Sequence, residues 1–376
     1  MKVTIATGLY PPEIGGPATY AAMLEADLPA KGIDVTVLPF GLVRHHPKLI
    51  RHFVYAWKLW QLSRDTDVIY ALDPISVGLP AMLVAKFRRK TFLVRLGGDY
   101  AWEQGRIRFG VKDTLDDYLA NRKDWSLPVR FFAFLQTYVV SNAGRVIVPS
   151  KYLKTVVEKW GIASEKITVI YSALFPLQVK GGREELRHQL SYTQPTIVSA
   201  GRLVPWKGFK ALIDVVAKLR HTYPHITLII VGDGEDLEKL EAQVADLKMS
   251  EHVRFAGRLS KDALGATIKA ADVFVLNTAY EGLSHQLIEV MDIGTPIVTT
   301  FAGGNTELIT NGVNGFLVPF NNHAGLTEAI TRVLNHPESR ERIVQSARLR
   351  SREFTKEKVI IEIASVLKTF HVGNKN

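Results

Sequence analysis

Short runs of apolar, β-branched residues alternate with helix-like segments along the whole chain, and this rhythm occurs twice. In the first half the sequence predicts the strands Val3–Ala6, Val35–Leu38, Val68–Ala71, Phe92–Arg95, Val146–Val148 and Ile167–Ile170. In the second half it predicts Thr196–Ala200, Thr227–Val231, Val253–Phe255, Val273–Leu276, Ile297–Thr299 and Phe316–Val318. Strands that alternate with helices form parallel sheets covered on both faces. We therefore predict an α/β protein with two Rossmann-like domains that face each other across a central cleft.

The break in this rhythm places the domain boundary. The chain of 376 residues is long enough for two cores. The alternation stops at residues 171–194, which include two adjacent glycines, so we place the inter-domain linker there. The predicted domains are residues 1–175 and 190–353. Residues 354–376 form a further helix with two alternatives: it packs on the second domain, or it returns to the first.

The composition excludes several classes of protein. The chain has no cysteine, which excludes disulfides, thiolate metal sites and a cysteine nucleophile. Its start, MKVTIATGLYPPE, lacks the apolar core of a signal peptide, and no later stretch approaches about 18 uninterrupted apolar residues. We therefore expect a cytoplasmic protein, with peripheral attachment to the cytoplasmic face of a membrane as the alternative.

Positive charge is concentrated in the first half of the chain. The formal net charge is +10, and residues 1–170 carry 23 Lys and Arg against 15 Asp and Glu. This excess favours an anionic partner, such as a membrane, a phosphorylated acceptor or nucleic acid, with an ordinary solvated surface as the alternative. The motifs of the usual nucleic-acid-binding folds are absent, so we expect no nucleic-acid partner.

Two glycines follow the first predicted strand. Gly15 and Gly16 stand directly before Pro17 and a predicted helix over Ala18–Ala30. Glycines let the backbone approach a ligand closely, and a helix N-terminus offers free N–H groups to an anion. An ordinary strand-to-helix turn is the alternative. The G-x-G-x-x-G pattern of nicotinamide enzymes is absent here.

Two cations follow the first strand of the second half. Gly201 and Arg202 come directly after that strand, and Lys207 stands at the start of the next helical segment. A diphosphate suits both the fork of donors on Arg and the point charge of Lys. The sequence therefore predicts a diphosphate site, with solvated loop cations as the alternative. After the next strand, Gly232 is expected to leave room for a ligand, and Asp233 to cap a tight turn.

The most informative motif lies between Asn277 and Glu289. Ser284 is a preferred N-cap residue, so a helix is predicted to begin near it. Glu281 then lies in the strand-to-helix loop, and the N–H groups around Leu283 point toward an anion. Glu289 stands roughly 7 Å along the helix axis, at about 1.5 Å per residue, among apolar neighbours. An unpaired buried carboxylate is costly, so we expect Glu289 to bind a ligand such as a ribose diol, with a solvated helix face as the alternative.

These motifs resemble those of the retaining glycosyltransferases of family 4, which share the two-domain GT-B architecture. The segment Gly201–Gly208 is similar to that family's diphosphate clamp, and Glu281 with Glu289 matches its E-x7-E motif. The resemblance covers nearly the whole chain. It implies the transfer of a hexosyl unit from a nucleoside-diphosphate sugar to a hydroxyl acceptor, with no metal ion and no other cofactor.

The resemblance also implies roles for individual residues. Glu281 would contact hydroxyls of the transferred sugar and Glu289 the ribose, while Arg202 and Lys207 would hold the diphosphate. The expected donor-binding residues are Gly15, Gly16, Gly201, Arg202, Lys207, Gly232, Glu281, Gly282, Leu283, Ser284 and Glu289. The expected catalytic residues are Arg202, Lys207 and Glu281, together with Asp99 of the first domain.

The acceptor side departs from the family's pattern. Asp99 follows a strand at the place where many relatives carry a histidine-containing motif. We expect Asp99 to lie near the acceptor hydroxyl as a base or orienting group, with a turn aspartate that caps the next segment as the alternative. Asp73 is a second candidate. The segment Tyr171-Ser172-Ala173 stands where relatives often have Asn-Gly, which puts that segment's usual ligand contact in doubt.

A helical segment over Lys48–Trp60 has two interpretations. Its residues Ile50, Phe53, Trp57 and Trp60 recur at helical spacing and form one apolar stripe. The first interpretation is a helix packed in the core. The second is a basic, aromatic surface resting on anionic lipid, to which the charges of Phe87–Lys90, Arg106 and Arg108 would add. Such a surface would suit a lipid-linked acceptor in cell-envelope polysaccharide assembly.

Two other functions share the predicted fold. One is a sugar-nucleotide epimerase, which needs no acceptor. The other is a non-catalytic nucleotide-binding protein. No spacing of His, Asp and Glu typical of a metal site is present, so we expect no bound metal.

Overall fold

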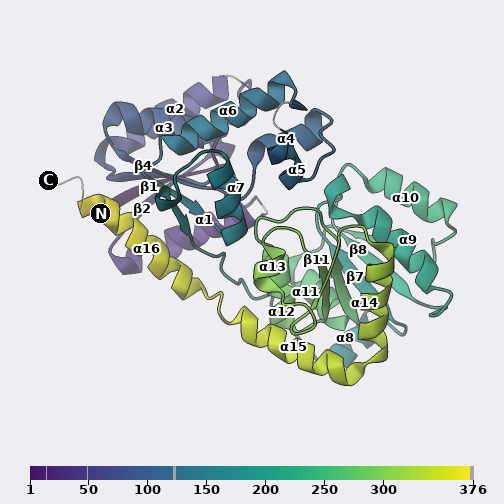
Figure 1. The fold of residues 1–376 in the computed structure, drawn as a ribbon. Helices are drawn as coiled ribbons and strands as arrows, with labels where there is room; N and C mark the ends of the chain where they lie inside the picture. The colour runs from purple at the N-terminus through teal and green to yellow at the C-terminus, as the bar shows by residue number, and fades with distance from the viewer. Residues whose placement is uncertain (14, 49, 122–123, 373–376) are drawn as a thin grey trace. The chain divides into compact units, whose positions relative to one another are not determined.

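The computed structural model describes residues 1–13, 15–48, 50–121 and 124–372 and divides into two compact units (Figure 1). The first unit consists of Met1–Ser172 with Lys356–Asn376, and the second of Ala173–Thr355. Each unit contains one six-stranded sheet with helices on both faces. The prediction of two Rossmann-like domains is confirmed.

The sheet of the first unit is parallel throughout, in the order β2-β1-β3-β4-β5-β6. Its strands are β1 (Lys2–Thr7), β2 (Asp34–Pro39), β3 (Val68–Ala71), β4 (Thr91–Arg95), β5 (Arg145–Val148) and β6 (Ile167–Val169). Its helices are α1 (Gly16–Asp27), α2 (Ile50–Leu62), α3 (Gly78–Arg88), α4 (Tyr100–Arg108), α5 (Leu115–Ala120), α6 (Leu127–Ser141), α7 (Lys151–Lys159) and α16 (Lys356–Val372).

Right-handed crossovers decide which face of this sheet each helix covers. In the sheet, β2 lies on one side of β1, whereas β3 and β4 lie on the other side. The connection from β1 to β2 therefore crosses the sheet in the opposite direction to the connections from β2 to β3 and from β3 to β4. As a result, α1 covers the face opposite α2 and α3. The C-terminal helix α16 packs against β3, and Lys356 at its start pairs with Asp27 at the end of α1. Of the two alternatives for residues 354–376, the structure therefore has α16 in the first unit.

The second unit repeats the design, in the parallel order β12-β11-β10-β7-β8-β9. Its strands are β7 (Thr196–Ala200), β8 (Thr227–Val231), β9 (Val253–Gly257), β10 (Val273–Leu276), β11 (Ile297–Thr300) and β12 (Phe316–Val318). Its helices are α8 (Arg183–Gln189), α9 (Phe209–Leu219), α10 (Leu237–Asp246), α11 (Lys261–Ala270), α12 (His285–Ile293), α13 (Asn305–Leu308), α14 (His323–Asn335) and α15 (Pro337–Ser351). Strands β7, β8, β10 and β11 are buried almost throughout, which explains their continuous apolar, β-branched sequences.

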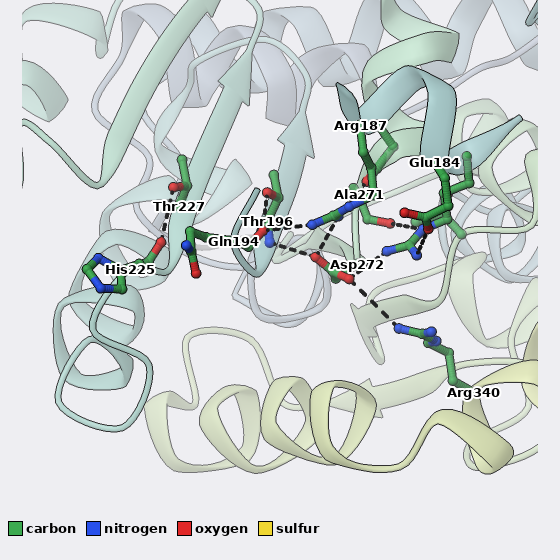
Figure 2. A network of polar contacts seen from close by, with 12 residues as sticks. Glu184, Arg187, Gln194, Thr196, His225, Thr227, Ala271, Asp272 and Arg340 are labelled. Carbon is green, nitrogen blue, oxygen red and sulfur yellow. Dashed lines mark hydrogen bonds and ion pairs between the residues drawn. The ribbon is translucent and has the colours of Figure 1, made fainter. Parts of the chain in front are cut away.

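The predicted linker region contains ordered structure of its own. Helix α8 lies within residues 171–194 and belongs to the second unit. Its two arginines bond to Asp272, which lies directly before β10, and Figure 2 shows Arg187 and Asp272 of this cluster. The Asp272 carboxylate accepts hydrogen bonds from Arg183 at 2.6 Å, from Arg187 at 3.0 Å and from the Thr196 amide at 2.8 Å. Arg340 of α15 completes the cluster at 3.8 Å. One carboxylate thus fastens two helices to the amino edge of the second sheet.

Replacing Asp272 tests this fastening. Asp272→Ala would leave three guanidinium groups and an amide without their shared acceptor, and we expect a loss of about 3 kcal/mol in the free energy of unfolding. Urea unfolding of the full chain, followed by far-UV circular dichroism, measures this change. The control is Glu184→Ala, which removes an exposed carboxylate that also pairs with Arg183 and should cost about 0.5 kcal/mol or less. Equal stability of the two variants would show that the cluster does not hold the unit together.

Candidate functional site

A charged pair stands at the carboxyl edge of the second sheet. Lys207 lies in the loop after β7, and Glu281 lies in the loop after β10. These two strands are neighbours in the sheet, so the loops at their carboxyl ends meet. The Lys207 ammonium donates a hydrogen bond to a Glu281 carboxylate oxygen. Their side chains are only 17% and 14% exposed, so the pair is largely shielded from water.

Backbone hydrogen bonds hold the Glu281 loop in place. The amide of Ala279 donates to the Trp206 carbonyl at 2.8 Å, and the Thr278 hydroxyl donates to the same oxygen at 3.3 Å. On its other side, the Glu281 carbonyl accepts the amide of Gly304 at 2.9 Å. The carboxylate therefore projects from a loop that is fixed by the loops after β7 and β11.

Two glycines allow these loops to touch through their backbones. Gly232 has φ +135°, and a Cβ added to it would lie 1.9 Å from the Gly201 carbonyl oxygen. A Cβ on Gly304 would lie 2.4 Å from the Gly282 carbonyl oxygen. A side chain at either position would push neighbouring loops apart. We expected Gly232 to leave room for a ligand, and in the structure it leaves room for the Gly201 carbonyl.

The helix after Glu281 begins where the sequence predicts. Helix α12 starts at His285, and the Ser284 side chain caps it by accepting the Leu287 amide at 3.3 Å. The first-turn N–H groups and the helix dipole make this end electropositive. Gly282 and Leu283, which lead into the helix, are buried. An anion at this edge would therefore meet both the Lys207 ammonium and the start of α12.

Glu289 lies inside α12 and is half-buried. Burial raises the pKa of Glu289 from its ordinary value of 4.5 to about 7, and the positive charge of Lys261 opposes this rise. When ionised, such a carboxylate can accept hydrogen bonds from a ligand.

Arg202 lies apart from the Lys207–Glu281 pair. Its side chain is 52% exposed, and its guanidinium lies 3.4 Å from the exposed carboxylate of Glu235. The guanidinium carbon lies 6.0 Å from the centre of the Trp206 ring. The structure therefore joins Lys207 to Glu281 directly and leaves Arg202 at the rim, in a weak ion pair that a stronger anion can displace.

Asp99 takes the capping alternative in the first unit. It is the N-cap of α4, and one carboxylate oxygen accepts the Trp102 amide at 2.9 Å and the Gln136 side-chain amide at 3.1 Å. The other oxygen accepts the Trp160 indole N–H at 3.1 Å. The side chain has no solvent exposure. The catalytic interpretation of Asp99 is corrected for this reason: both of its oxygens already serve the fold and neither is open to an acceptor.

Asp73 is the more open carboxylate of the first unit. It follows β3 and is half-buried, and one oxygen accepts the amides of Ile75 at 3.0 Å and Val77 at 3.2 Å. The other oxygen faces Gly8 after β1, where an added Cβ would lie 2.9 Å from it. Burial raises the pKa of Asp73, and its backbone hydrogen bonds oppose this rise.

The remaining first-unit candidates lie at the ends of strands. Helix α1 begins at Gly16, and the Gly15 carbonyl accepts the amide of Thr19 at 3.1 Å. Ser172, in the segment that departs from the family's pattern, accepts a hydrogen bond from the buried Arg95 at 3.2 Å. The part of the chain that the structure describes contains no group of three His, Asp or Glu residues that could hold a metal ion.

Asn277 begins the motif that ends at Glu289, but the sequence did not indicate its role. The Asn277 side chain donates to the Gly208 carbonyl at 2.9 Å and to the Asn321 side chain at 2.9 Å, and it accepts the Asn321 amide at 3.1 Å. It thereby ties the Lys207 loop to the end of β10 and to the loop after β12. The available signal was a polar residue directly after the buried run Val273–Leu276.

Comparison with known families decides what this site belongs to. The model of Glycosyltransferase Family 4 matches residues 14–174, and the model of Glycosyl transferases group 1 matches residues 183–350. The chain belongs to the family 4 glycosyltransferases. The interpretation of the chain as a glycosyltransferase is thereby confirmed.

Curated relatives of this glycosyltransferase share the name of the activity. The chain is 34% identical over 151 residues to the lipopolysaccharide core biosynthesis glycosyltransferase LpsE of Rhizobium meliloti, a match that covers 40% of this chain and 43% of LpsE. It is 28% identical over 388 aligned positions to the uncharacterized glycosyltransferase MJ1607 of Methanocaldococcus jannaschii, covering 93% of each. The match with LpsE thus spans less than half of that relative.

Solved structures share the fold of this glycosyltransferase. Anabaena HepE in complex with UDP-glucose superposes with a TM-score of 0.78 at 22% identity, covering 98% of this chain and all of that one. Sucrose-phosphate synthase of Thermosynechococcus elongatus gives a TM-score of 0.79 at 18% identity, with 99% of each chain covered. At these identities the likeness concerns architecture, and it agrees with the GT-B prediction. None of the helices in the described residues has the length and apolarity needed to cross a bilayer.

The raised pKa of Glu289 predicts how pH affects stability. The folded glycosyltransferase holds the Glu289 proton more tightly than the unfolded chain does, so the free energy of unfolding falls as pH rises from 4.5 to about 7. Glu289→Gln removes this dependence. Between about pH 5 and about pH 8, wild type should lose on the order of 2 kcal/mol relative to the variant, as urea unfolding at each pH measures. Parallel curves for the two proteins would contradict the assignment.

Proposed function

We propose that this glycosyltransferase moves a hexosyl unit from a nucleoside-diphosphate sugar to a hydroxyl acceptor with retention of the anomeric configuration. We further propose that it does so without a metal ion or other cofactor. The observation that carries this proposal is the shielded Lys207–Glu281 pair beside the N-terminus of α12. Lys207 and the N-terminus of α12 offer positive charge to the diphosphate of the donor, and Glu281 offers a carboxylate to its sugar.

The cations suit the leaving group. When the glycosidic bond to the donor breaks, negative charge develops on the diphosphate, and fixed positive charge at that place lowers the barrier. Lys207 and the start of α12 supply such charge from rigid positions. Arg202 can leave its exposed partner Glu235 and bind the diphosphate with two N–H groups. In this mechanism the residues do the electrostatic work for which other transferases use a divalent ion.

The carboxylates suit the sugars of the donor. Glu281, oriented by its bond to Lys207, accepts hydrogen bonds from hydroxyls of the transferred hexose. Glu289, half-buried and about half-ionised near neutral pH, accepts hydrogen bonds from the ribose diol. In the first unit we assign the orientation of the acceptor hydroxyl to Asp73, because Asp99 is fully engaged.

The comparisons supply the first donor and acceptor to test. HepE has been crystallised with UDP and with UDP-glucose, so a uridine nucleotide is the first donor to try. LpsE is named for lipopolysaccharide core biosynthesis, which favours a lipid-linked or other cell-envelope glycan precursor as the acceptor. We place the enzyme in the cytoplasm, at the membrane surface where such an acceptor would be presented.

A thermal-shift panel tests the diphosphate site. UDP, GDP, ADP and TDP and their sugars are compared, and a ligand at roughly 100 times its Kd stabilises by about 2.7 kcal/mol. We expect Arg202→Ala and Lys207→Ala to abolish the shift given by wild type. The control is Lys218→Ala, which replaces an exposed lysine near the end of α9 and should keep the full shift. A full shift in the Lys207 variant would place the diphosphate elsewhere.

Glu281→Gln separates turnover from binding. The amide keeps the shape of the side chain but loses the charge that pairs with Lys207 and accepts from sugar hydroxyls. We expect turnover to fall about 100-fold or more, with the thermal shift given by the nucleoside diphosphate retained. Initial rates with saturating donor measure this loss. Unchanged turnover would remove Glu281 from the mechanism.

A further inference from the structure

Three helices of the first unit expose large apolar side chains. Each of these residues is between 58% and 80% exposed, which is unusual for so many large apolar groups in one region. They are Phe53 and Trp57 on α2, Phe87 on α3, and Leu127, Phe131 and Phe134 on α6. Burial in the core was one interpretation of the α2 stripe. The structure buries Tyr55 and Leu59 of that helix instead.

These side chains belong to one face of the first unit. Helix α2 packs on α3 and α3 packs on α6, and the three helices lie side by side on the same face of the sheet (Figure 1). Residues that point away from the sheet therefore face in one common direction. Arg88 joins α2 to α3, because its guanidinium lies 3.8 Å from the Trp60 ring and donates to the Trp60 carbonyl at 3.0 Å.

The charge of this face has one sign. The three helices contain no Asp or Glu, and their cations are Arg51, Lys58, Lys86, Arg88 and Arg130. Arg89 and Lys90 follow α3 directly. Aromatic side chains interleaved with Lys and Arg are typical of surfaces that enter the headgroup region of anionic bilayers. A second copy of the chain is disfavoured as the occupant, because a two-fold interface would bring the same cations together.

We propose that the face formed by α2, α3 and α6 docks on an anionic lipid bilayer. The six exposed apolar side chains enter the boundary between headgroups and acyl chains, and the cations contact the headgroup phosphates. The contact itself does not depend on the donor chemistry. Its use, the capture of a lipid-linked acceptor, rests on the proposed function. The contribution of α6 extends the surface well beyond the stripe on α2.

Flotation with vesicles tests the apolar part of the face. Wild type should float with vesicles of phosphatidylcholine and phosphatidylglycerol at low salt. With vesicles of phosphatidylcholine alone it should remain in the bottom fraction. The double variant Phe131→Ser with Phe134→Ser should partition at least about tenfold less. The matched control is Leu349→Ser with Ile361→Ser, which removes two exposed apolar side chains from α15 and α16. This control should float like wild type.

Charge variants test the electrostatic part. The double variant Lys58→Gln with Lys86→Gln should lower the bound fraction several-fold at low salt. High salt should lower the bound fraction of wild type to a similar level. The control pair is Lys218→Gln with Lys368→Gln, two exposed lysines outside the face.

Three results would overturn the proposal. The first is that wild type binds vesicles of neither composition. The second is that the α6 variant floats like wild type. The third is that the protein self-associates and the α6 variant abolishes this self-association. The thermal shift with UDP, measured on the same variants, should be unchanged. Loss of flotation with an intact shift therefore separates a failure of the lipid contact from a failure of the donor site.

Discussion

The rest of the account depends on the ion pair between Lys207 and Glu281. The two charges come from loops at the ends of neighbouring strands, and the fold brings them into contact with little access to water. In such a place each charge stabilises the other, and removing one leaves the other uncompensated. The same shielding makes the pair a strong local source of field for a ligand, because few water molecules screen it. Arg202, exposed at the rim, adds charge that can move to meet a ligand.

In the second unit, different contacts act at the amino ends and at the carboxyl ends of the strands. At the amino edge, Asp272 gathers arginines from α8 and α15 directly before β10 begins. At the carboxyl edge, glycines let the loops meet backbone to backbone, as Gly232 does with Gly201. Strand β10 therefore runs from a structural carboxylate at one end to the loop with Glu281 at the other. The Asp272 contacts fasten the helices to the sheet, and the hydrogen bonds from Ala279 to Trp206 and from Asn277 to Gly208 hold the Glu281 and Lys207 loops together.

Much of this was predictable from the sequence, and the exceptions have physical causes. Buried parallel strands are continuous apolar runs, so the twelve predicted strands lie within one or two residues of those observed. Ser284 was recognisable as an N-cap because the preference for serine at this position depends only on the local sequence. Asp99 was not separable from a catalytic aspartate, because Gln136 and Trp160, which engage it, lie 37 and 61 residues away in the chain. The exposed residues of α6 were missed since its sequence is apolar on several sides, and only the packing decides which side is covered.

A crystal structure of the protein with a bound nucleoside-diphosphate sugar, beginning with UDP-glucose, tests the central claim most directly. The account predicts diphosphate oxygens within hydrogen-bonding distance of the Lys207 ammonium and the first turn of α12, with Glu281 turned to the hexose hydroxyls and Glu289 to the ribose. A nucleotide bound away from this edge, with Lys207 and Glu281 still paired only to each other, would contradict it.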